Sequence, residues 1–348
     1  MSNKVTGSNG VADKPQALVT FENETIALAE GESLLDGLTR TGHSIPSGCR
    51  VGVCQACMVV MREGEPSNVC QKGLSAPQKA LSYVLSCQCK PNRPVTISRL
   101  SAASQQTQGR ILAKDWLNES VLRLRIKADL DYRAGQYVTL WHGEELARSY
   151  SLASVPGEDD FLEFHIKHVP GGAFSPALCN ELRAGDTIGL QGPLGQCFYT
   201  AKPDQPLLLV GIGVGLAPLI GILKDALYKG HSGPIALIVG AAKASNFYLQ
   251  QALGDLAKNY EQLTVQFIAQ SVDRAIDQPA EESIDQLNSS TALEGDLYSF
   301  CRNNYPDLKG YRVFLCGAES FVTKMRKQCF LSGAGMSDIS ADAFISFH

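Results

Sequence analysis

Residues 49–57 read CRVGVCQAC, which places Cys49, Cys54 and Cys57 in one short loop, and Cys87 follows after 29 further residues. Small residues in and around the loop allow the backbone to wrap closely round a bound group and to point N–H groups at sulfur. Three thiolates from a tight loop and a fourth from a distant segment suit a cluster of two irons. Zinc, the alternative, prefers Cys-x2-Cys accompanied by a second such pair or by histidines, and the histidines here offer no such pairing. The spacing therefore predicts a [2Fe–2S] site.

Two further cysteines lie near these four. Cys89 follows Cys87 by two residues, so both side chains would face the same side of an extended segment, and only the spacing favours Cys87 as the fourth ligand. Cys70 has no place in the pattern and is interpreted as a buried structural thiol. Eleven cysteines with this local clustering in a chain of 348 residues indicate a metal in a reducing compartment rather than a disulfide scaffold.

The composition is that of an ordinary globular protein, with 44% hydrophobic and 19% charged residues. A formal net charge of −4 argues against nucleic acid as the main partner. No apolar run approaches the roughly 20 residues that span a bilayer, and the longest, 206–223, is interrupted by glycines and Pro218. Residues 1–15 are polar and lack a secretory signal, so we expect a disordered tail on a cytoplasmic protein without a transmembrane segment.

The length predicts two or three domains. Residues 98–109, SRLSAASQQTQG, are small and polar and form one candidate linker, and AKPDQP at 201–206 marks a second break. We expect a first domain at 16–100, a linker at 101–107, a second domain at 108–202 and a third domain at 203–348.

The hydrophobic patterns of the three segments differ. The first opens with a predicted hairpin and an amphipathic helix, at Ala17–Phe21, Thr25–Ala29 and Ser33–Thr41. The second is rich in strands, which predicts an antiparallel barrel; the expected strands are Val121–Lys127, Gln136–Trp141, Phe161–His168 and Thr187–Gln191. The third alternates strands and helices, which predicts a parallel α/β sheet; the expected elements are Leu207–Val210, Leu219–Tyr228, Ile235–Val239, Phe247–Leu256, Thr264–Ala269 and Tyr311–Leu315.

Two short stretches of the second segment suggest a bound dinucleotide. Arg148-Ser149-Tyr150-Ser151 follows an apolar run, and His165-Ile166-Lys167 leads to Gly171-Gly172-Ala173-Phe174-Ser175 at the start of a helical stretch. A glycine pair, a hydroxyl group and a helix N-terminus together suit a pyrophosphate, because exposed N–H groups and the helix dipole both favour anions.

The third segment opens with the strand Leu207–Val210 and the turn Gly211-x-Gly213-Val214-Gly215-x-Ala217-Pro218. This turn is not the usual dinucleotide fingerprint of dehydrogenases, because its third glycine comes one residue early and a proline follows. Cys316-Gly317 ends a later predicted strand, and Asp342-Ala343-Phe344 lies near the C-terminus.

These motifs resemble those of the ferredoxin–NADP reductase superfamily. The resemblance implies that Tyr150 packs on the flavin ring, Ser151 reaches the region of flavin N5 and Arg148 pairs with phosphate. It also implies that Gly172–Ser175 hold the pyrophosphate of FAD, and that His165 contacts flavin mainly through its backbone. Further cofactor contacts are implied for Ser149, Ile166, Lys167 and Gly171.

On the nicotinamide side, the same resemblance implies contacts from the glycine-rich turn and from Cys316-Gly317, which would abut the nicotinamide ring. The residues concerned are Gly211, Gly213, Val214, Gly215, Pro218, Cys316 and Gly317. Val214 stands where many relatives have threonine. Phe344 matches a terminal aromatic residue that covers the flavin until nicotinamide displaces it, so Ser151, Cys316 and Phe344 are the expected catalytic residues.

Residues 16–100 resemble plant-type ferredoxin domains, and Cys49, Cys54, Cys57 and Cys87 match the ligands of that family one by one. The resemblance implies a β-grasp fold. Gln55 departs from it, since many relatives have glycine there.

The order of the three segments resembles the reductase components of bacterial multicomponent oxygenases. The resemblance implies electron transfer from NADH or NADPH through FAD and a [2Fe–2S] cluster to a terminal oxygenase. Alternatives are an electron acceptor other than an oxygenase, such as a deoxysugar dehydratase system, and a carrier module without enzymatic activity. The loop after Val239 has no acid for a ribose and only one lysine, Lys243, so the residues leave NADH and NADPH open, and the family favours NADH.

Overall fold

The computed structural model describes residues 17–47, 50–53, 55–74, 78–79, 81–100, 107–143, 146–272 and 292–344. The chain divides into two compact units, residues 1–105 and 106–348. The predicted tail at 1–15 lies outside the described residues, as does the predicted linker up to residue 106.

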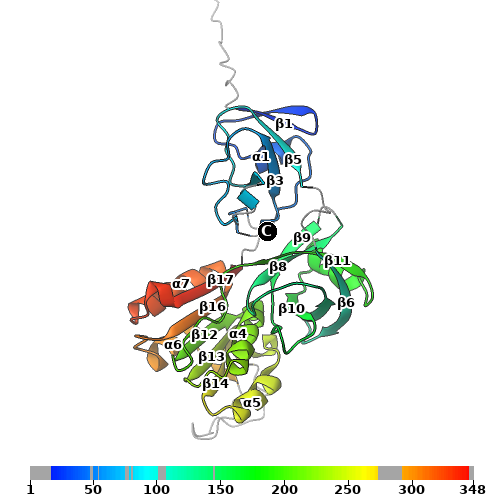
Figure 1. Cartoon of the computed structure of the whole chain (residues 1–348). Helices are drawn as coiled ribbons and strands as arrows, with labels where there is room; N and C mark the ends of the chain where they lie inside the picture. The colour runs from blue at the N-terminus through cyan, green and yellow to red at the C-terminus, as the bar shows by residue number, and fades with distance from the viewer. Residues whose placement is uncertain are drawn as a thin grey trace, which may run out of the picture. The chain divides into compact units, whose positions relative to one another are not determined.

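The first unit is a mixed five-stranded sheet with one helix packed against it (Figure 1). Its elements are β1 (Ala17–Phe21), β2 (Glu24–Leu28), α1 (Leu34–Arg40), β3 (Met58–Glu63), β4 (Tyr83–Leu85) and β5 (Val95–Arg99). The strand order is β2-β1-β5-β3-β4, with β1 and β5 parallel and the other pairs antiparallel. This is the β-grasp arrangement, and the predicted hairpin and helix are confirmed.

Helix α1 begins where the sequence provides a cap. The Ser33 hydroxyl group accepts a hydrogen bond from the backbone N–H of Asp36 at 3.2 Å, which satisfies one N–H group of the first helical turn. The leucines of the helix, among them Leu34 and Leu38, are buried in the core between helix and sheet. Helix α1 is therefore fixed beneath the sheet that carries the cysteine segments.

The second unit begins with a six-stranded antiparallel sheet in the order β10-β7-β6-β11-β8-β9. Its elements are β6 (Thr107–Trp116), β7 (Val121–Lys127), β8 (Tyr137–His142), β9 (Leu146–Ser151), β10 (Leu162–Lys167), α3 (Phe174–Asn180) and β11 (Thr187–Leu194). An antiparallel bridge between Leu152 and Phe164 joins the two edges of the sheet, and Phe164 is fully buried. The sheet thus curls round one apolar core, and the barrel prediction is confirmed.

The last part of the chain contains a sheet that is entirely parallel, in the order β15-β14-β13-β12-β16-β17 (Figure 1). Its strands are β12 (Leu207–Ile212), β13 (Ile235–Lys243), β14 (Leu263–Ser271), β15 (Ala292–Glu294), β16 (Arg312–Ala318) and β17 (Ile339–Phe344). Its longer helices are α4 (Leu216–Tyr228), α5 (Gln250–Asn259), α6 (Leu297–Asn304) and α7 (Glu319–Leu331).

Alternate residues of β12 enter two separate cores. Leu207 and Leu209 pack in one core with residues of α4 and α5, whereas Leu208 and Val210 pack in another with residues of α6 and α7. A strand buried on both faces needs a continuous apolar run, which explains the sequence Leu207–Val210. The predicted α/β sheet is confirmed.

Two elements depart from the expected pattern. Strand β6 begins at Thr107, the last residue of the segment interpreted as a linker, in a stretch where no strand was expected. Helix α5 begins at Gln250 rather than Phe247, because Phe247 and Tyr248 are buried in the core and Leu249 adopts a left-handed conformation with φ of 60°.

Candidate functional site

The structure brings the segments of Cys57 and Cys87 together in the first unit. The backbone N–H and the hydroxyl group of Ser86 both donate to the carbonyl oxygen of Cys57, at 3.1 and 2.8 Å. The Gln88 amide donates to the carbonyl oxygen of Arg50 at 3.0 Å and lies 3.5 Å from the Cys87 sulfur. The segment of Cys87 is thus joined to the loop that carries the other cysteines. Cys49 and Cys54 lie outside the described residues.

The backbone of the cysteine loop has a conformation that allows it to wrap round a bound group. Arg50, Gly52 and Gln55 have φ angles of 51°, 82° and 56°, in the left-handed region. Gln55 tolerates this because its buried side chain donates to the carbonyl oxygen of Gly73 at 3.0 Å and accepts from Gln78 at 3.1 Å. The departure from glycine at position 55 therefore has a structural compensation, and the loop fits a [2Fe–2S] cluster.

Cys89 and Cys70 form a separate pair of thiols. Both are buried, and the Cys70 sulfur also lies 3.0 Å from the carbonyl oxygen of Ser67. The neighbouring Cys70 thiol and burial both raise the pKa of Cys89. The spacing of the motif remains the ground on which Cys87 is expected as the fourth ligand.

Strand β9 presents the predicted flavin-binding residues in sequence. Ser149 is hydrogen-bonded to Thr139 through their hydroxyl groups at 2.9 Å, while Arg148 is exposed and donates to the carbonyl oxygen of Ala147 at 2.8 Å. The Tyr150 ring lies 5.7 Å from the Phe174 ring, centroid to centroid, and burial raises the pKa of its hydroxyl group. Tyr150 is thus held as a neutral, fixed aromatic surface.

The predicted pyrophosphate loop is ordered by one hydroxyl group. Ser175 Oγ accepts a hydrogen bond from the backbone N–H of Val169 at 3.0 Å, which closes the loop over Gly171, whose φ is 75°. At the other end of α3, Lys114 donates to the carbonyl oxygens of Leu178 and Cys179 at 2.6 and 3.0 Å. Of the other residues predicted for this loop, Gly172 is partly exposed, Ala173 is exposed and Phe174 is buried.

The side chains of His165, Ile166 and Lys167 lie in different environments. Ile166 is fully buried in the barrel core, so only its backbone is available to a cofactor. The His165 ring is buried, with Nε2 3.1 Å from Glu163 and Nδ1 3.3 Å from the Tyr248 hydroxyl group. Because a carboxylate only accepts, Nε2–H donates to Glu163 and Nδ1 accepts from Tyr248. Lys167 is exposed at the end of β10.

Glu163 fixes this arrangement. Burial alone would raise the pKa of its carboxyl group, but hydrogen bonds from His165 and from Arg125, which donates at 2.8 Å, hold that pKa at about 2. Burial also lowers the pKa of His165, so the imidazole is neutral. A series of hydrogen bonds thus runs from Arg125 through Glu163 and His165 to Tyr248. It joins the barrel to the part of the chain that contains the parallel sheet.

The glycine-rich turn meets the end of β16. A Cβ on Gly215 would lie 2.2 Å from the carbonyl oxygen of Cys316, so only glycine fits at this position. Gly211 pairs with Cys316 in the parallel sheet, and Pro218 lies in the first turn of α4, where its missing N–H costs nothing. The structure thus places the turn and Cys316-Gly317 in contact, although about 100 residues of sequence separate them.

Ser151 and Asp342 join the barrel to the last strand of the parallel sheet. The Ser151 hydroxyl group donates to Asp342 Oδ2 at 2.6 Å, and Asp342 lies opposite Cys316 in the pairing of β16 with β17. Burial raises the pKa of Asp342 to about 6. The Cys316 thiol is fully buried, 3.9 Å from the sulfur of Cys197, and burial also raises its pKa. Phe344 ends β17 and is half-buried.

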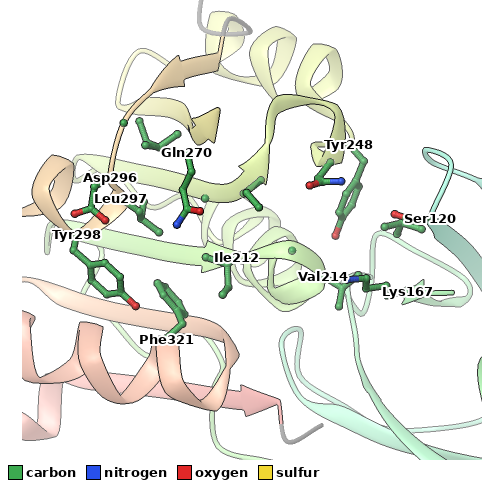
Figure 2. Close-up of a pocket in the computed structure, with 18 residues that line it drawn as sticks. Ser120, Lys167, Ile212, Val214, Tyr248, Gln270, Asp296, Leu297, Tyr298 and Phe321 are labelled. Carbon is green, nitrogen blue, oxygen red and sulfur yellow. The ribbon is translucent and has the colours of Figure 1, made fainter. Parts of the chain in front are cut away.

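A cavity of about 370 Å³ opens at the carboxyl ends of the parallel strands, where open α/β sheets bind their ligands (Figure 2). Gly213 and Val214 of the turn line it together with residues of the barrel, and Figure 2 shows Val214 beside Lys167 and Ser120. Its principal polar and aromatic lining residues are Asn246, Tyr248, Gln270, Asp296, Tyr298 and Lys167.

Comparisons with known proteins agree with this geometry. Residues 19–92 match the 2Fe-2S iron-sulfur cluster binding domain, 110–199 the oxidoreductase FAD-binding domain and 209–327 the oxidoreductase NAD-binding domain. The chain is 31% identical over 340 residues to the ferredoxin–NAD(P)(+) reductase component of the naphthalene 1,2-dioxygenase system of Pseudomonas putida, with 94% of this chain and 98% of the relative covered. The chain belongs to the family of oxygenase reductase components.

Other relatives of this reductase extend the comparison. It is 32% identical over 246 residues to the reductase subunit of an aromatic O-demethylase of Amycolatopsis, with 66% of this chain and 73% of the relative covered. A crystal structure of an Amycolatopsis cytochrome P450 reductase matches with a TM-score of 0.64 and 26% identity, covering 94% of this chain and 98% of the other. The described part of the chain has no helix that is both long and apolar enough to cross a membrane.

Three residues of the site were missed from the sequence. Tyr248 was assigned to a helix, although it reaches the cavity from an extended segment. Asp296 was detectable, because an aspartate before an amphipathic stretch is an N-cap signal, and its carboxylate accepts from the N–H of Ser299 at 2.8 Å. Asp342 was recognised only as a neighbour of Phe344, and its contact with Ser151 had no local signal, since 191 residues separate the two.

The fourth cluster ligand can be tested by a pair of alanine substitutions. We expect Cys87→Ala to abolish the [2Fe–2S] signal in electron paramagnetic resonance, because the thiolate is lost, while Cys89→Ala keeps it. Cys70→Ala is the matched control, since it removes the partner of Cys89 without touching the loop. Retention of the signal in Cys87→Ala together with its loss in Cys89→Ala would show that the assignment is wrong.

Asp342 should make the stability of the reductase depend on pH. Its folded-state pKa of about 6 lies above the ordinary value of 3.8, so the protonated form is favoured by folding and stability is lost as pH rises through this window. An amide side chain cannot ionise, so Asp342→Asn should not lose stability over this pH range. Above pH 7 we expect the variant to be more stable than wild type, by at most roughly 3 kcal/mol in the free energy of unfolding. Melting curves at pH 4 and pH 7.5 measure this difference. An equal difference at both pH values would contradict the assignment.

Proposed function

We propose that this reductase oxidises NADH or NADPH, passes the electrons through FAD to a [2Fe–2S] cluster and delivers them singly to a terminal oxygenase. The observation that carries the proposal is the hydrogen bond between Ser151 and Asp342. It holds the predicted flavin strand β9 against β17, beside Cys316 at the end of β16. Hydride transfer requires such proximity, because the donor and acceptor atoms must approach to about 3–3.5 Å.

The cluster would be held by Cys49, Cys54, Cys57 and Cys87. The conformation of the loop and the hydrogen bonds of Ser86 to the carbonyl oxygen of Cys57 support this set. Bound in this loop, the cluster supplies one-electron chemistry.

FAD would lie along β9 and the loop before α3, and flavin supplies the step from electron pairs to single electrons. Tyr150, fixed against Phe174, would pack on the flavin ring, and exposed Arg148 would pair with phosphate. Backbone N–H groups of Gly172–Ser175 would bind the pyrophosphate. The match to the FAD-binding domain over residues 110–199 supports this placement.

The nicotinamide ring would lie between β9 and the end of β16. The Gly215 turn and Cys316 meet there, and the buried Cys316 thiol offers an uncharged surface. Ser151 Oγ would hold a proton near the reacting atoms and exchange it with Asp342, whose raised pKa suits transfer near neutral pH. Phe344, two residues beyond Asp342, would cover the flavin face until nicotinamide enters.

The proposed partner is a terminal oxygenase, because the relatives are named as components of oxygenase systems. We place the protein in the cytoplasm, where the nicotinamide pool and the reduced state of its eleven cysteines would be maintained.

Anaerobic titration of the purified reductase with NADH tests the proposal. We expect bleaching of the flavin absorbance followed by a [2Fe–2S] signal in electron paramagnetic resonance. Reduction of flavin without appearance of the cluster signal would contradict the electron path, and the absence of both changes would contradict the enzymatic assignment altogether.

NADH is the proposed nucleotide. Asp296 lines the cavity, and the hydrogen bond from the backbone of Ser299 lowers the pKa of its carboxyl group, so it is ionised and would repel a 2′-phosphate. Lys167, on the barrel side, is the one Lys or Arg among the cavity-lining residues of the described chain. We expect Asp296→Asn, which retains an N-cap, to lower KM for NADPH several-fold and to leave KM for NADH within about twofold. Steady-state kinetics with both nucleotides measure this, and an unchanged ratio would contradict the role of Asp296.

A further inference from the structure

The charge of the chain is divided unevenly between its two units. Residues 1–105 contain ten Lys and Arg against eight Asp and Glu, whereas the rest of the chain contains 21 against 27. Within the first unit the acids are further confined, because residues 37–62 and 66–100 contain no Asp or Glu at all. These two stretches include the whole cysteine loop and the segments that contact it.

Three lysines border the cysteine loop. Lys72 precedes Gly73, whose carbonyl oxygen accepts from Gln55 in the loop, and Lys79 follows Gln78, which donates to Gln55. Lys90 follows the segment of Gln88, which donates to the carbonyl oxygen of Arg50. All three lysines are exposed, and no ion pair involves them among the residues that the structure describes. Arg50 differs from them, since it pairs with Asp36.

Exposed apolar side chains belong to the same segments as these lysines. Val51 and Val53 belong to the loop itself and are 52% and 51% exposed. Leu81, 57% exposed, lies in the tight turn in which the N–H of Ser82 donates to the carbonyl oxygen of Lys79. Exposed apolar side chains together with charged ones are typical of a protein interface, and here the charges are positive.

We propose that Val51, Val53, Lys72, Lys79, Leu81 and Lys90 form the docking surface for a separate electron-accepting protein that presents acidic side chains round an apolar patch. The inference rests on the proposed function, since it requires that electrons leave at the cysteine loop. An acidic acceptor is attracted by the three lysines and guided to the loop, where the apolar side chains make contact.

The chain's own second unit is also acidic, but it has less need of such attraction. A tethered unit reaches its neighbour at an effective concentration in the millimolar range, whereas a separate protein at micromolar concentration depends on electrostatic steering for fast encounter. We therefore assign the lysines to delivery rather than to transfer inside the chain.

Charge reversal on the holoenzyme tests this surface. The variant Lys72→Glu/Lys79→Glu/Lys90→Glu is compared with Lys202→Glu/Lys309→Glu/Lys327→Glu, which changes exposed lysines of the second unit and shifts the net charge equally. The probes are cytochrome b5, an acidic one-electron acceptor, and cytochrome c, a basic one. We expect the first variant to reduce cytochrome b5 about tenfold more slowly than wild type at low salt, and cytochrome c faster. The control variant should match wild type, and the difference should vanish at high salt.

The internal steps are measured in the same samples. Stopped-flow reduction of flavin and cluster by NADH should be unchanged in the first variant, which separates this inference from the proposed function. A slower cluster reduction would assign the surface to the chain's own second unit and overturn the proposal. Equal rates of both variants with both cytochromes would show that the lysines are solvated charges only, and would overturn it as well.

Discussion

The carbonyl oxygen of Cys316 lies 2.2 Å from the point where a Cβ on residue 215 would stand, and this contact of backbone with backbone organises the reductase site. Gly215 permits the turn after β12 to close on the end of β16, and the turn leads directly into α4. The cavity at the strand ends takes its shape from this closure, since Gly213 and Val214 line it. Any side chain at position 215 would push the turn away from Cys316 and separate the two nucleotide motifs.

Polar contacts then fix the barrel to the parallel sheet at two places. The bond from Ser151 to Asp342 lies beside Cys316, and the chain from Glu163 through His165 to Tyr248 lies at the cavity. The contacts of His165 are buried and that of Ser151 with Asp342 is partly buried, so leaving a partner unpaired would cost about 1–3 kcal/mol. The relative position of the flavin strand and the nucleotide cavity is therefore specified by hydrogen bonds as well as by apolar packing.

The two ends of the electron path differ in the burial and charge of their side chains. At the nucleotide end, burial raises the pKa values of Cys316 and Asp342 and so disfavours the charged forms of both side chains. At the cysteine loop, Lys72, Lys79 and Lys90 remain exposed and charged. Neutral, buried groups suit a hydride, which moves inside one protein, whereas exposed charges act at a distance on a partner that must diffuse to the surface.

The sequence by itself determined the three modules and most of their elements. Cys49, Cys54, Cys57 and Cys87 are recognisable because a cluster loop needs a fixed spacing, and the apolar run Leu207–Val210 before a glycine-rich turn predicts a buried strand. Tertiary structure alone decided the contacts between distant segments, such as that of Ser151 with Asp342 across 191 residues and that of His165 with Tyr248 across 83. It also brought Cys70 and Cys89 into the same buried core. Spacing and periodicity describe neighbours along the chain, whereas these contacts depend on how strands from different parts of the sequence are ordered in a sheet, and no local pattern encodes that order.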